Sequence, residues 1–163
     1  MTDPQPLALT AGEAASLVHR ELGAAALALQ AAELDAAFDA YVRALGLALQ
    51  LGPALVEEVL RAVVDGARHL AHRGNAVGLA TLGPAVAGLV GQVREAGALP
   101  ANPEMEAWAA VAVEIGALVG QWGVALSLPA EHRPALHARL QARAALLDAA
   151  TGSLFNLAAW PEG

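Results

Sequence analysis

Cysteine and lysine are both missing from this chain of 163 residues. The lack of cysteine excludes disulfides, thiolate nucleophiles and thiolate metal ligands. The lack of lysine excludes a Schiff-base lysine and the lysine of a phosphate-binding loop. A domain of this size buries about 70% of the surface that its unfolded chain exposes, so it needs neither a disulfide nor a metal to fold.

Positive charge is also scarce, because nine basic residues face sixteen acidic ones and leave a net charge of −7. Nucleic acids demand a positive footprint, so we expect no nucleic-acid partner. The opening residues, MTDPQPLAL, contain an acidic residue and no basic one, unlike the start of a secretory signal. We therefore expect a cytoplasmic protein.

Strand-forming residues are few, with aromatics at 4% of the chain. Alanine, leucine and valine dominate the hydrophobic 56%, and no run alternates between apolar and polar residues as a half-buried strand does. This composition predicts an all-α protein. We expect a flexible arm over residues 1–9 and then a single compact domain, a bundle of five or six helices over residues 10–160.

Several short motifs predict where helices begin and end. Thr10 and Glu13 have the spacing of a capping box, which starts a helix. The tetrapeptide LGPA occurs at 51–54 and again at 82–85, without the wider similarity of a true repeat. In the first copy we expect Gly52 to end one helix in the left-handed conformation and Pro53 to begin the next, which runs to about residue 73. In the second copy, proline inside the helix at 76–96 predicts a kink or a break.

The helix expected over about 103–127 is apolar on almost every side. Asn102 is a suitable N-cap, with Pro103 at the first helical position. An apolar helix of this kind is expected at the centre of the bundle. One of its faces carries large residues, and three glycines share another.

The chain has more apolar surface than a small monomer easily hides, which points to association. We expect a homo-oligomer, a dimer, or a complex with a partner protein, and no catalytic activity. The candidate interface residues are small residues that permit close helix approach and aromatic or apolar anchors: Trp108, Gly116, Gly120, Trp122, Gly123, Leu154, Phe155 and Trp160. For the glycines, internal packing against the 76–96 helix is the alternative.

An enzyme is the second hypothesis. Asp65, His69 and His72 have a helical spacing that could place one carboxylate and two imidazoles on one face, as a metal-dependent hydrolase requires, with Glu58 nearby. The same face carries arginines at i,i+4 spacing, the pattern of a solvated helix laced with ion pairs. We therefore expect no metal and no cofactor.

Three further possibilities remain open at this stage. Glu114 lies among apolar residues, so it is a candidate for a buried charge with a raised pKa or for an ion pair across the bundle. A cavity beside the glycines could carry a small molecule or cofactor. Residues 76–91 and 107–126 are apolar enough to raise membrane insertion, but the first is short and the second contains Glu114, so no membrane is expected.

Overall fold

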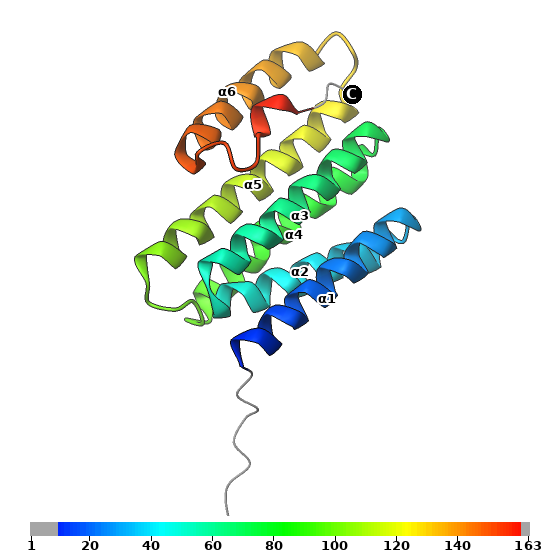
Figure 1. Ribbon diagram of the computed structural model, residues 1–163. Helices are drawn as coiled ribbons and strands as arrows, with labels where there is room; N and C mark the ends of the chain where they lie inside the picture. The colour runs from blue at the N-terminus through cyan, green and yellow to red at the C-terminus, as the bar shows by residue number, and fades with distance from the viewer. Residues whose placement is uncertain (1–9, 161–163) are drawn as a thin grey trace, which may run out of the picture.

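The computed structural model describes residues 10–160, which form six α-helices, a short 3-10 helix and no strand (Figure 1). The elements are α1 (Ala11–Gln30), α2 (Leu34–Leu51), α3 (Pro53–His72), α4 (Ala76–Glu95), α5 (Pro103–Ser127), α6 (Arg133–Thr151) and η1 (Leu157–Ala159). The all-α bundle of five or six helices is thus confirmed. The arm expected over residues 1–9 lies outside the described residues.

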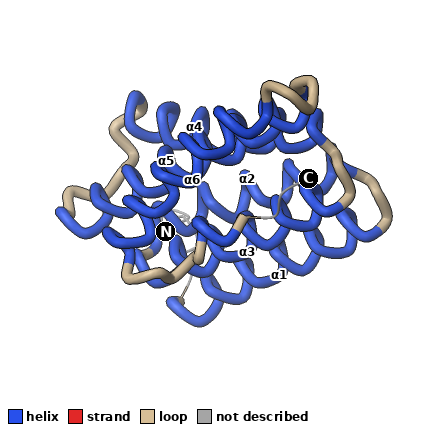
Figure 2. The backbone as a smooth tube through the Cα atoms, turned by 90° about the horizontal axis from the view of Figure 1, so that it is seen from above, coloured by secondary structure: helices blue, strands red, loops and turns tan. Residues whose placement is uncertain are grey.

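The helices lie alongside one another in two layers (Figures 1 and 2). Helices α1 and α3 are in front in Figure 1, with α2 and α4 behind them, and α5 lies between this group and α6. The pair α4–α5 makes the most extensive contact between elements in the described chain. The segment after α6 turns back and rests on α6 through η1.

Local signals start these helices as expected. Thr10 Oγ1 accepts a hydrogen bond from the Glu13 N–H at 3.1 Å, and the Glu13 carboxylate accepts from the Thr10 N–H at 3.2 Å. Asn102 Oδ1 accepts from the Glu104 N–H at 2.9 Å, and Pro103 occupies the first helical position. Each cap satisfies donors that have no partner within the helix.

One expectation about the LGPA motifs is wrong in detail, and of the two outcomes expected at Pro84 the break is absent. Gly52 lies between α2 and α3 as predicted, but its φ of 167° is extended backbone and not the left-handed conformation. Helix α4 continues through Pro84 without a break. The missing hydrogen bond is tolerated because Pro84 is exposed and the backbone of the helix is held against α5 at the adjacent Gly83.

The core takes side chains from all six helices and from the segment after α6. Helix α5 contributes some of its largest buried residues, including Ile115, Leu118 and Trp122. It is not enclosed on every side, since Ala110, Gln121 and Val124 remain exposed. The outward side of α5 is therefore open to solvent.

Candidate interaction surface

Glycines bring the backbones of α4 and α5 into direct contact. A Cβ atom on Gly116 would lie 2.7 Å from the carbonyl oxygen of Gly83, and one on Gly123 would lie 2.6 Å from the backbone nitrogen of Ala80. A Cβ on Gly83 would overlap the backbone of α5 at Gly116 and Gly120. Any larger side chain at these positions would force the two helices apart.

The predicted interface glycines are therefore used inside the chain. Gly116 and Gly123 are buried against α4, as the internal-packing alternative describes. Gly120 differs, because it is only partly buried and lies beside the exposed ring of Pro84. It belongs to a groove on the outer side of the pair.

That groove has a volume of about 260 Å³ and runs between the outward sides of the two helices. It is lined by small and uncharged residues: Ala80, Pro84, Ala87, Gly116, Ala117, Gly120, Gln121 and Val124. Val77 lies one helical turn before Thr81 and Ala80 and is 77% exposed, and Val124 is 45% exposed. We name the groove residues, with Val77 and Thr81, the α4–α5 face.

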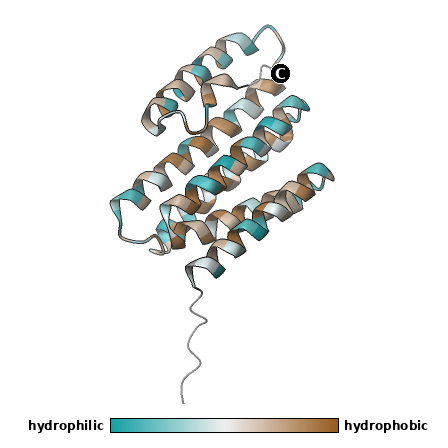
Figure 3. Ribbon diagram, viewed as in Figure 1, coloured by the Kyte–Doolittle hydropathy of each residue, from teal (hydrophilic) through white to brown (hydrophobic). Residues whose placement is uncertain are grey.

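The α4–α5 face carries no charged residue. Farther along the two helices, Arg94 of α4 pairs with Glu106 of α5 at 3.5 Å, and exposed Glu114 of α5 pairs with Arg143 of α6. The hydropathy colouring in Figure 3 shows α5 brown along most of its length, whereas α1 and α3 carry conspicuous teal patches. Charged side chains are thus concentrated on other parts of the described surface.

The predicted aromatic anchors are turned inward and hold the chain's own segment of residues 154–160, named here the strap. Trp122 and Trp160 are 1% and 4% exposed, and their rings stack with centroids 4.1 Å apart and an interplanar angle of 3°. Phe155 is buried and packs against half-buried Trp108, with ring centroids 6.2 Å apart and an interplanar angle of 82°. Of the five anchors, Leu154 alone is exposed.

Polar side chains from α3 and α6 complete the hold on the strap. The buried Asp148 carboxylate accepts hydrogen bonds from the backbone N–H groups of Leu157 at 2.8 Å and Ala158 at 2.9 Å. The Arg68 guanidinium donates to the carbonyl oxygen of Phe155 at 2.7 Å and lies 5.9 Å from the Trp160 ring centroid. Nothing in the sequence pattern distinguishes Asp148 or Arg68, because Arg68 contacts residues 87 and 88 positions away and Asp148 contacts a segment outside its own helix.

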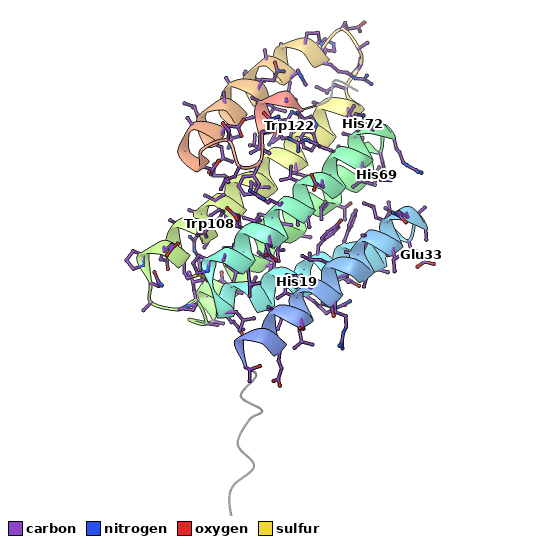
Figure 4. All side chains as sticks on the ribbon, in the orientation of Figure 1. His19, Glu33, His69, His72, Trp108 and Trp122 are labelled. Atoms are coloured by element: carbon purple, nitrogen blue, oxygen red, sulfur yellow. The ribbon has the colours of Figure 1, made fainter. Side chains whose placement is uncertain are left out.

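The proposed metal ligands do not converge. Within residues 10–160, no group of three or more histidine or acidic side chains is placed to hold a metal ion. Asp65 is exposed and lies 3.9 Å from Arg68, and His72 is exposed near the end of α3, as Figure 4 shows. Glu58 instead contacts His19 of α1 at 2.6 Å. Asp65 and His72 lie on a solvated surface, whereas His69 is partly buried and its Nε2 atom is buried.

Glu114 is not a buried charge. Its side chain is about half exposed at the edge of α5, where its carboxylate accepts a hydrogen bond from Arg143 of α6 at 3.2 Å. Both structural alternatives to a buried acid, a surface position and an arginine partner, are realised together. An acid–base role based on burial has no support at this position.

Helices α4 and α5 are also long and apolar enough to cross a membrane. Of their most apolar stretches, 39% and 50% of residues are buried inside the fold. Core helices of soluble proteins have the same length and hydropathy, so these properties carry little weight by themselves. Comparisons of the chain with models of protein families, with curated proteins and with solved structures found no match.

Proposed function

We propose that this protein acts without catalysis, by self-association through the α4–α5 face. The observation that carries the proposal is an uncharged, apolar and grooved surface on a chain whose net charge is −7. Exposed apolar surface of this kind marks association sites. The surface replaces the aromatic anchors expected from the sequence, which the chain itself buries.

Electrostatics favour this surface over the rest of the described exterior. Two copies with the same negative charge repel one another, and ionised groups trapped between them would have to lose their hydration. Neither penalty arises between two α4–α5 faces, since neither carries a charge. The ion pair of Arg94 and Glu106 is not part of the face, so it would remain in water.

The shape of the face also suits a second copy. In a symmetric dimer the same patch is used on both subunits, so a projecting side chain of one copy meets the hollow of the other. Val77 and Val124 project beside the groove, whose floor is made of alanine, glycine and proline. Small residues at the floor allow the helices of two copies to approach closely.

The test is a matched pair of charge insertions. Ala80→Glu places a carboxylate in the groove, whereas Ala145→Glu makes the same change at an exposed position of α6 away from the face. Analytical ultracentrifugation over a range of concentrations measures the oligomeric state. We expect the parent chain and Ala145→Glu to be dimers and Ala80→Glu to be mainly monomeric.

Two results would overturn the proposal. A parent chain that stays monomeric at every concentration removes self-association. A dimer fraction that is the same in Ala80→Glu as in the parent chain shows that the contact lies elsewhere. Co-sedimentation of the parent chain with neutral phosphatidylcholine vesicles, lost in Ala80→Glu but not in Ala145→Glu, would assign the face to a lipid surface instead.

A further inference from the structure

The strap is attached to the bundle by contacts that do not depend on which molecule it belongs to. Trp160 stacks on Trp122 of α5, Phe155 packs on Trp108 of the same helix, and Arg68 of α3 binds the strap backbone. We name the residues that hold the strap, Arg68, Trp108, Trp122 and Asp148, its cradle. The cradle of any copy of the chain offers the same groups.

The hinge that folds the strap back has an unfavourable backbone. Gly152 and Ser153 follow α6 with φ values of 65° and 59°, and Asn156 has a φ of 49°. Glycine adopts positive φ freely and asparagine tolerates it, whereas serine carries a Cβ that this conformation crowds. The closed arrangement therefore stores backbone strain at Ser153, and opening the hinge releases it.

From these two features we propose that the strap exchanges between two copies, so that residues 154–160 of one chain dock on α3, α5 and α6 of another. When the strap leaves its own cradle, the same stacking and hydrogen bonding form again in the second copy. The balance between closed monomer and exchanged dimer is then set mainly by the hinge and by the entropy of association. A short, strained hinge is the feature that favours such exchange.

The charge of the strap is compatible with docking on a second copy. Residues 152–160 read GSLFNLAAW and contain no ionisable side chain. Residues 152–160 themselves therefore bring no negative charge to the second copy, and the main polar requirements of the strap are met by Asp148 and Arg68 of the receiving copy. The partner that the cradle fits is a second copy of this chain.

This inference goes beyond the proposed function, because the cradle includes no residue of the α4–α5 face. The two contacts are therefore separable by mutation. Exchange should persist in Ala80→Glu, which blocks the α4–α5 face. That background is used for the test so that the failure of one proposal leaves the other standing.

The experiment uses spin labels, since the chain has no cysteine and a single introduced cysteine is labelled without ambiguity. Leu154 on the strap and Arg61 on α3 line the same cavity of about 270 Å³. One batch carries Leu154→Cys and the other Arg61→Cys, both in the Ala80→Glu background. The two are mixed, incubated in mild denaturant and returned to buffer, and dipolar spectroscopy measures the distance between labels.

We expect the mixture to show a short distance between labels. The reference is a chain that carries both labels and is diluted with unlabelled protein, because it reports the distance in the closed arrangement. The two distances should match. Each batch alone should lack the short distance, because its labels sit at one position only. A mixture without the short distance, alongside a doubly labelled chain that shows it, overturns the proposal.

Hinge variants provide a second, independent readout. Proline cannot adopt the φ of Ser153, so Ser153→Pro should raise the dimer fraction several-fold, whereas Ser153→Gly relieves the strain and should lower it. Sedimentation in the Ala80→Glu background measures both fractions. A monomeric Ser153→Pro whose tryptophans become accessible to a soluble quencher would mean that the strap opens without docking elsewhere, which contradicts exchange.

Discussion

Trp160 lies flat on Trp122, with ring centroids 4.1 Å apart and planes only 3° from parallel. The two residues are 38 positions apart in the chain, one in α5 and one at the end of the strap. Their stack joins the segment after α6 to the centre of the bundle. It also explains why these tryptophans, although suited to an interface, are not on the surface.

Loss of this stack should destabilise the folded protein. Trp160→Ala is expected to lower the free energy of unfolding by about 3 kcal/mol, the low end for truncating a buried tryptophan, because the strap lies at the margin of the core. Leu146→Ala is the control, since Leu146 is 74% exposed and should change stability by less than about 0.5 kcal/mol. Urea unfolding measures both, and equal effects would contradict the role of the stack.

Two glycines of α4 make a matched pair. Gly83→Ala is expected to destabilise by about 1–3 kcal/mol, because its Cβ would overlap the α5 backbone. Gly88→Ala meets no atom within 4 Å and should stabilise by up to about 1 kcal/mol through helix propensity. Thermal unfolding of the two variants should shift in opposite directions, and a shift in the same direction would disprove the close approach of α4 and α5.

Asp148 should matter through the backbone that it holds. Asp148→Ala removes the acceptor for two N–H groups, and each buried unsatisfied donor costs about 1–3 kcal/mol. Asp148→Asn keeps one acceptor oxygen and is expected to lie between this variant and the parent. Hydrogen exchange at the Leu157 amide should accelerate in the same order, and unchanged exchange in Asp148→Ala would refute the assignment.

Tyr41 is expected to titrate above the ordinary tyrosine range. Burial raises the pKa of its hydroxyl, and the negative charge of Asp65 raises that pKa further. Because the folded state holds the proton more tightly than the unfolded state, the stabilisation is complete below about pH 10 and is lost as pH rises through the folded pKa.

The chain contains one tyrosine, so the absorbance of tyrosinate reports Tyr41 alone. The folded protein should titrate at higher pH than the same chain in denaturant. Asp65→Asn should lower the folded pKa only in part, because burial is the larger cause. Coincident titrations of folded and unfolded protein would show that the hydroxyl is not held in the interior.

Glu114→Gln should change the free energy of unfolding very little. The carboxylate and Arg143 are both about half exposed, and ion pairs of this kind contribute about 0.2–1 kcal/mol. Unfolding in urea should therefore show a loss within that range, which added salt reduces in the parent chain. A loss of several kcal/mol would mean that Glu114 has a buried role after all.

Local chemistry made the helix boundaries readable from the sequence. The capping box at Thr10, the Asn102–Pro103 start and the Pro53 start of α3 each act within a few residues, so the neighbouring sequence contains their whole cause. At Pro84 a break is absent, because the contact of α4 with α5 outweighs one missing hydrogen bond. The same reasoning failed for the conformation of Gly52, since extended backbone joins α2 to α3 equally well.

Only part of the candidate surface could be predicted from the sequence. A run without charge over residues 76–91 and the glycines of α5 are visible in the sequence, and they correctly mark a place of close helix approach. Which glycines would be covered was not visible. Gly120 and Gly123 lie within one turn of α5, yet Gly123 is buried against α4 and Gly120 lines an open groove.

The sequence by itself determined that this chain is helical, where its helices begin, and that it carries neither thiol nor lysine chemistry. Only the tertiary structure decided that Trp122 and Trp160 cover each other, that Asp65, His69 and His72 do not converge, and that the outward side of α4 and α5 remains open. The physical reason is that helix formation depends on neighbours along the chain. Which apolar surface is buried depends on the distant segments that meet it, here above all the strap.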